Sequence, residues 1–383
     1  MIAYNQEWLN NQHIRQEAVS AFNKNFITKE EHQAITEKYP VAFYMPNLFI
    51  RIGLFVLTII ILLFSFGLVS LVIIDSIENS IGGLAILFGG LGFVALEYMI
   101  KTKKHYCSGV DDAMLWGAGI SLFCGISIPN EFGGLLNSLF IFIICSLATL
   151  RYADKLMAVV AFLAMLGILF YTCVETGSTA KAIAPFIIMA ASLATYFAVY
   201  PAKKRYLLYS SSLLMVEIAA LISLYAAGNY YVVREISDSM FQLNLQPGDT
   251  IPFGWLFWIF TALIPVIYLA RGIQKKDAVL LRVGLLLFAA IVFTVRYYHS
   301  LLPIEIIMTI GGIVLMTAAY GLMKWLTKPV HGFTSLEIPT GNDMDKMQIE
   351  SLILAQTFKP GTGTDRPISG GGDFGGGGAS GEY

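Results

Sequence analysis

The feature that most constrains this chain is a series of apolar segments, each long enough to cross a lipid bilayer as a helix. A crossing helix needs about 20 mainly apolar residues, because each residue advances the helix by only about 1.5 Å. Segments of that length run from Phe49 to Ile74, Ile81 to Ile100, Val110 to Ile128, Phe132 to Leu150, Leu156 to Val174, Lys181 to Tyr200, Tyr206 to Ala227, Pro252 to Ala270, Ala278 to Val295, and Leu302 to Trp325. The sequence therefore predicts an all-α fold, a polytopic bundle of about ten transmembrane helices.

Composition supports a membrane environment. Hydrophobic residues occupy 56% of the 383 positions and charged residues only 13%, which differs strongly from soluble proteins. The lipid bilayer is therefore the expected partner. The 25 basic and 26 acidic side chains give a formal net charge of -1, so no nucleic-acid partner is predicted.

The connections between these segments alternate in charge, which gives the predicted bundle an orientation. Loops that face the cytoplasm carry an excess of Lys and Arg. The basic set contains Lys101, Lys103, Lys104, Arg151, Lys155, Lys203, Lys204, Arg205, Arg271, Lys275, Lys276, Lys324 and Lys328, and the intervening loops are mainly acidic or neutral. An even number of spans with both termini in the cytoplasm satisfies this alternation.

Three further segments flank the transmembrane domain predicted over residues 49–325. Residues 1–48 predict a cytoplasmic helical pair, with a capping box between Thr28 and Glu31 and a stop at Pro40. Residues 326–360 predict a cytoplasmic tail with one short amphipathic helix, and residues 361–383 a disordered Gly-rich tail. Either terminal segment is a candidate site for a protein partner.

The long connection from Gly228 to Ile251 predicts either a short strand pair or an interfacial helix. An ordered loop over the helix ends and a gate or ligand lid are both compatible with its sequence.

Signatures of catalysis and metal binding are missing from the sequence. It contains no HExxH, GxSxG or Walker pattern and no Cys/His cluster with metal-ligand spacing. We therefore predict a protein that is not an enzyme, with no catalytic residue, metal ligand or cofactor.

Ionisable residues inside the predicted spans are the sharpest functional signal, because a carboxylate in the bilayer core is costly and usually faces protein or water. Glu217 lies near the middle of the seventh predicted span. It is a candidate for binding a proton, a cation or a polar substrate. The alternative is a carboxyl group that interhelical hydrogen bonds hold in place.

Five other residues are candidates for substrate or proton binding, and each also has an ordinary structural explanation. Glu97 precedes Lys101 by one helical turn and is expected to pair with it. Asp111 and Asp112 begin the third span, where they would pair with Lys101, Lys103 and Lys104 or cap the helix. Arg282 has Asp277 nearby in sequence, and Glu305 has Arg296 and His299 as possible partners.

The N-terminal pattern resembles a known family. The order of a two-helix start, the stretch Phe26-Ile-Thr-Lys-Glu-Glu-His-Gln-Ala-Ile before Tyr39-Pro40, and many spans joined by short connections resembles bacterial membrane proteins with domain of unknown function 2157. The ending Phe374-Gly-Gly-Gly-Gly-Ala-Ser-Gly is similar to Gly-rich tails of other bacterial membrane proteins. These resemblances imply a bacterial inner membrane and bring no activity with them.

Three functions compete on this evidence. The first is an integral membrane protein that acts by interaction, as an accessory or scaffold component. The second is a secondary transporter that uses Glu217, since transporters often place a binding site at mid-membrane depth. The third, an intramembrane enzyme, lacks a nucleophile and base that the sequence would pair.

Overall fold

The computed structural model describes residues 2–23, 26–73, 81–241 and 251–298, together with isolated helical positions between 309 and 324. Helices account for nearly all of these residues. The described part contains no strand, only one isolated bridge between Tyr44 and His105. The predicted all-α class is confirmed.

The described helices follow one another through short connections. They are α1 (Gln6–Asn23), α2 (Lys29–Lys38), α3 (Leu48–Ile73), α4 (Ile81–Lys103), α5 (Val110–Ser127), α6 (Gly134–Tyr152), α7 (Lys155–Thr176), α8 (Ser178–Arg205), the 3-10 turn η2 (Leu207–Tyr209), α9 (Ser210–Gly228), α10 (Tyr230–Phe241), α11 (Gly254–Lys275) and α12 (Ala278–Tyr298).

Eight helices in the described ranges are long and apolar enough to cross a membrane, as expected of an integral membrane protein. They are α3, α4, α6, α7, α8, η2 with α9, α11 and α12. Helix α5 occupies the third predicted span but is not among the eight, and its first turn carries two aspartates. The tenth predicted span, apart from isolated positions, and the segments 326–360 and 361–383 lie outside the described residues.

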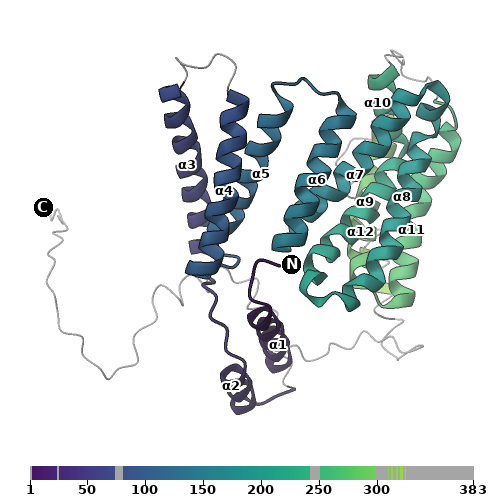
Figure 1. The fold of residues 1–383 in the computed structure, drawn as a ribbon. Coiled ribbons are helices and arrows are strands. Elements are labelled where there is room, and N and C mark those ends of the chain that lie inside the picture. The colour runs from purple at the N-terminus through teal and green to yellow at the C-terminus, as the bar shows by residue number, and fades with distance from the viewer. Residues whose placement is uncertain are drawn as a thin grey trace, which may run out of the picture.

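The long helices run side by side, with α1 and α2 beyond one end of the bundle and α10 at the other (Figure 1). Helices α4, α6, α8 and α11 each carry Lys or Arg in the last turn. We call the end that these turns and α1 share the basic end. Cations there also lie favourably at the negative ends of the helix dipoles.

Small residues let α4 and α5 approach closely. A Cβ added to Gly89 would lie 2.9 Å from the Ala118 carbonyl oxygen, and one added to Gly125 would lie 2.6 Å from the Gly82 carbonyl oxygen. Gly82 and Gly89 therefore allow α4 to pack closely against α5.

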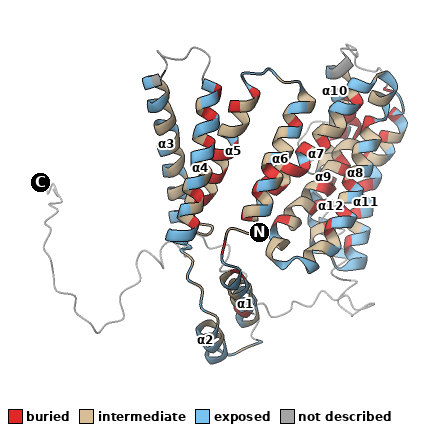
Figure 2. Ribbon diagram, in the orientation of Figure 1, coloured by how far each residue is buried: buried red, intermediate tan, exposed pale blue. Residues whose placement is uncertain are grey.

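The largest buried core lies among α7, α8, α9, α11 and α12, where Tyr196, Leu221 and Leu280 meet. Fewer residues are buried at the opposite side of the molecule, where α3 lies (Figure 2). No residue in the most apolar part of α3 is fully buried, and half-buried positions alternate with exposed ones along the helix.

The connection from Gly228 to Ile251 contains the helix α10, which agrees with the interfacial-helix alternative. Asn229 holds its start by donating through Nδ2 to the Tyr225 hydroxyl at 2.9 Å and to Thr294 Oγ1 at 3.0 Å. Tyr230 stacks on Trp258 with 4.8 Å between the ring centroids. Aromatic rings of this kind gather where membranes meet water.

Candidate functional site

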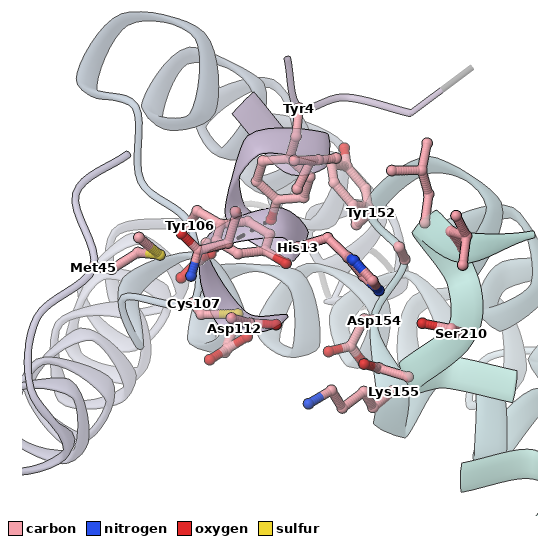
Figure 3. Close-up of a pocket in the computed structure, with 18 of the residues that line it drawn as sticks. Tyr4, His13, Met45, Tyr106, Cys107, Asp112, Tyr152, Asp154, Lys155 and Ser210 are labelled. Carbon is pink, nitrogen blue, oxygen red and sulfur yellow. Dashed lines mark hydrogen bonds between the residues drawn. The ribbon is translucent and has the colours of Figure 1, made fainter. Parts of the chain in front are cut away.

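A cavity of about 690 Å³ lies between α1 and the basic end of the bundle. Its lining comes from α1, the α4–α5 connection, the α6–α7 turn and the start of α9. In Figure 3, Cys107 and Asp112 lie on one side of this cavity, and Asp154, Lys155 and Ser210 lie on the other. The volume falls in the range of small-molecule sites.

Asp111 is fixed in one wall by short-range hydrogen bonds. Its Oδ1 accepts from the Ser108 backbone N–H at 2.8 Å and from the Ser108 hydroxyl at 3.0 Å. The Tyr4 hydroxyl donates to Oδ2 over a longer distance of 3.4 Å. Asp111 is buried, and Tyr4 brings the N-terminal segment directly onto it.

Asp112 pairs with a partner that sequence reasoning did not select. Its Oδ2 lies 2.6 Å from Nη2 of Arg51 at the start of α3. No ion pair joins either aspartate to Lys101, Lys103 or Lys104, so that alternative is wrong; of the capping alternative, the structure has the contact in which Asp111 accepts from the Ser108 N–H just before α5. Lys101 pairs with Glu97, and the Lys104 ammonium lies 4.9 Å from the Trp8 ring centroid.

Asp154 faces the cavity from the α6–α7 turn, where its Oδ1 caps α7 by accepting from the Met157 N–H at 2.7 Å. Burial raises the pKa of Asp154, and the nearby Asp111 charge adds to that shift, while the hydrogen bonds of the cap oppose it. Lys155 follows directly but forms no ion pair with Asp154 within 4 Å.

The aromatic and thiol groups of the cavity are in their neutral forms at neutral pH. Burial raises the pKa of Tyr4 and of Tyr106, and it raises the pKa of the Cys107 thiol to about 11. A thiol of this kind is a weak nucleophile, because the thiolate is the reactive form.

The arrangement can hold a polar or cationic ligand. Three carboxylates, Asp111, Asp112 and Asp154, share the lining with the cations of Arg51 and Lys155, so negative charge is in excess before His13 is counted. The described part of the chain contains no group of three or more His, Cys, Asp or Glu that could hold a metal ion.

Glu97 belongs to an ion-pair cluster beside the cavity. Its Oε1 lies 2.7 Å from Arg151 Nε, and its Oε2 lies 2.9 Å from Arg151 Nη2 and 3.0 Å from Lys101 Nζ. The predicted pair with Lys101 is confirmed. The two-point contact with Arg151 joins α4 to α6, which indicates a structural role.

Glu217 lies in a different place, inside the core of α8 and α9. Its side chain is fully buried, and Oε2 forms an ion pair with Lys203 from the last turn of α8. Oε1 is buried without a hydrogen-bond partner. Since Glu217 is seven residues after Ser210, it lies about 10 Å along α9 from the basic end.

Arg282 lines neither the cavity under α1 nor the surroundings of Glu217. Arg282 is exposed on α12, and no ion pair joins it to Asp277. Asp277 instead caps α12 by accepting from the Val279 N–H at 2.9 Å, so the expected pair is wrong. Glu305 lies outside the described residues.

Sequence reasoning missed Tyr4, Arg51, Asp154 and Lys203. Arg51 gave a usable signal, because it lies inside the first predicted span, where a guanidinium needs a partner. Lys203 was counted only as a loop charge, although the turn that separates it from Glu217 is short. Asp154 directly precedes an apolar segment, which is a signal for a helix N-cap but not for its place in the cavity. Tyr4 gave no signal, because its role depends on contact with the distant Asp111.

No protein-family model matches this chain, and neither the curated proteins nor the solved structures contain a significant match.

Proposed function

We propose that this integral membrane protein acts by interaction, as a non-catalytic accessory or scaffold component, and that the helix pair α1–α2 is the surface its protein partner binds. One observation carries the proposal: the pair is anchored to the bundle at one side and exposes apolar side chains on the other. The family resemblance, the bacterial inner membrane and cytoplasmic termini are part of the same proposal.

The anchor is specific. The Ala3 N–H donates to the Arg151 carbonyl oxygen at 2.8 Å, and the Tyr44 N–H donates to the Lys104 carbonyl oxygen at 2.9 Å. Leu9 is buried in a core shared with α4, α5, α6 and α7. These contacts fix the pair at both of its ends, which is what a docking platform needs.

Apolar side chains on the outer surface of the α1–α2 pair stay exposed, because no other described part of the chain covers them. Phe26 is 71% exposed and Val19 45% exposed, while α2 buries none of its side chains. Exposed apolar groups on a segment outside the bilayer favour contact with another protein. Asp111 lines the cavity, whereas Glu217 and Arg282 do not, which also favours interaction over a single transport site.

Photo-crosslinking tests the proposal. A benzophenone amino acid at Phe26, in cells that express the full chain, is expected to give a defined adduct. Adding Val19→Asp should abolish that adduct, and the same probe at the exposed polar position Glu30 serves as the control. Deleting residues 361–383 tests whether the tail contributes to binding of the partner. An adduct pattern and partner set unchanged by both the substitution and the tail deletion would contradict the proposal.

A second candidate, a secondary transporter that uses Glu217, has one observation in its favour. Glu217 keeps one buried carboxylate oxygen without a hydrogen-bond partner, which is a position that a proton or donor group could occupy. Its test is Glu217→Gln in reconstituted vesicles, where uptake or proton coupling must be lost. Retained coupling would remove this residue from any transport mechanism.

A further inference from the structure

An apolar groove of about 510 Å³ lies among α6, α7, α8 and α9, apart from the cavity under α1. All four helices are among those able to cross a membrane, so the groove lies at membrane depth. Its wall is made mainly of Leu150, Ala158, Phe162, Met165, Leu213 and Val216. A groove of this size and lining suits a hydrocarbon chain.

The groove ends at two tyrosines near the basic end. Tyr206 and Tyr209 both line it, and the Tyr209 hydroxyl donates to the Leu150 carbonyl oxygen at 2.7 Å. Tyrosine with one apolar and one polar end is typical of the membrane–water boundary. The groove therefore extends from the headgroup level into the hydrocarbon layer.

Two cations precede the groove-lining Tyr206 in sequence at this end of the groove, and neither is part of its wall. Lys204 and Arg205 are exposed and directly precede Tyr206, and the Arg205 guanidinium lies 5.6 Å from the Tyr206 ring centroid. Their neighbour Lys203 is already engaged by Glu217. Among the described residues, no carboxylate lies within 4 Å of Lys204 or Arg205.

We propose that this groove is a binding site for an anionic glycerophospholipid of the surrounding bilayer. One acyl chain occupies the groove, and Lys204 and Arg205 bind the phosphate and its anionic headgroup. Basic residues at the end of a helical groove supply the charge complementarity that distinguishes an anionic lipid from a zwitterionic one.

The test uses the purified full chain in mild detergent, titrated with dioleoyl phosphatidylglycerol or dioleoyl phosphatidylcholine and followed by native mass spectrometry. Wild-type protein should retain phosphatidylglycerol preferentially. The variant Lys204→Gln/Arg205→Gln should weaken phosphatidylglycerol binding about 10- to 30-fold, since each basic group near a headgroup contributes about one factor of five. The control Lys103→Gln/Lys276→Gln removes the same charge from the same end and should change binding little.

A second pair of variants tests the acyl-chain part. Leu213→Trp fills the groove and should reduce binding of both lipids, whereas Leu163→Trp, on an exposed position of α7 outside the groove, should not. Equal affinity for the two lipids in wild-type protein would overturn the headgroup assignment. Unchanged lipid binding by folded Leu213→Trp would overturn the assignment of the groove as the acyl-chain site. If that variant does not fold, the Lys204→Gln/Arg205→Gln variant still decides whether an anionic lipid binds here.

Discussion

Lys203 and Glu217 join α8 to α9 through an ion pair whose two ends have different surroundings. The Glu217 side chain has no exposed surface, whereas 21% of the Lys203 side chain is exposed. Breaking the pair would therefore leave the Glu217 carboxylate without access to solvent, whereas the Lys203 side chain would keep some contact with it.

We expect Lys203→Met to lower the free energy of unfolding by about 3–5 kcal/mol, because it leaves a buried carboxylate without its partner. The double variant Lys203→Met/Glu217→Leu should recover most of that loss, since an apolar pair needs no compensating charge. Denaturant unfolding in detergent micelles measures both. A single variant as stable as wild type would show that the pair contributes nothing.

The buried Asp154 carboxyl makes the stability of the protein depend on pH. Burial raises its pKa, so the folded protein holds a proton at pH values where the unfolded chain has released it. Its contribution to stability is present below the unfolded pKa of about 3.9 and is lost as pH rises through the raised folded value. We expect Asp154→Asn to remove this decline above about pH 4 while keeping an acceptor for the Met157 N–H.

Thermal unfolding at a series of pH values measures that slope. Asp154→Ala is the comparison, because it removes the charge and the cap together and should cost about 1 kcal/mol. If Asp154→Asn and wild-type protein lose stability in parallel as pH rises, another group is responsible.

At the scale of helices, α4 carries two adjacent glycines whose surroundings differ. A Cβ at Gly89 would meet Leu122 Cγ at 2.7 Å, whereas one at Gly90 would meet nothing within 4 Å. Gly89→Ala is therefore expected to destabilise the protein by about 1–3 kcal/mol through overpacking. Gly90→Ala should be neutral or stabilising by up to about 1 kcal/mol. Unfolding midpoints compare the two, and equal effects would contradict the close contact of α4 with α5.

The helices were predictable because membrane spans follow from length and hydropathy, which the local sequence contains. Each expected segment from Phe49 to Val295 coincides with a helix to within a few residues. Helix α10 could be named only as one of two alternatives, since its polar and aromatic residues fit either a strand pair or an interfacial helix.

Partners were much less predictable than helices. Glu97 and Lys101 are one turn apart in one helix, so their pair follows from helical periodicity alone. Asp112 pairs with Arg51 across 61 positions of sequence, and that choice depends on how α3 and α5 meet. Sequence spacing near Asp112 pointed to the nearest lysines, which the folded loop directs away.

At the scale of the whole molecule, the shared basic end predicts which loops lie on one side of the membrane. Single cysteines introduced at Lys103 and Lys204 should react with a membrane-impermeant maleimide only in inverted vesicles, and cysteines at Glu131 and Glu175 only in intact cells. The background replaces the native thiols at Cys107, Cys124, Cys145 and Cys173. Labelling of all four positions from the same side would contradict the alternating arrangement.

The close contact between α3 and the start of α5 bears on the order in which the chain assembles. Gly109, with φ of 89°, has no side chain, and an added Cβ would lie 2.2 Å from the Arg51 carbonyl oxygen. Helix α3 is the first of the eight apolar helices to be synthesised and the most apolar of them, so it can enter the bilayer without its neighbours. It can pack against the start of α5 only after Gly109 and α5 have been synthesised. A bulky residue at Gly109 would thus leave α3 inserted but unassembled, a defect of late assembly rather than of insertion.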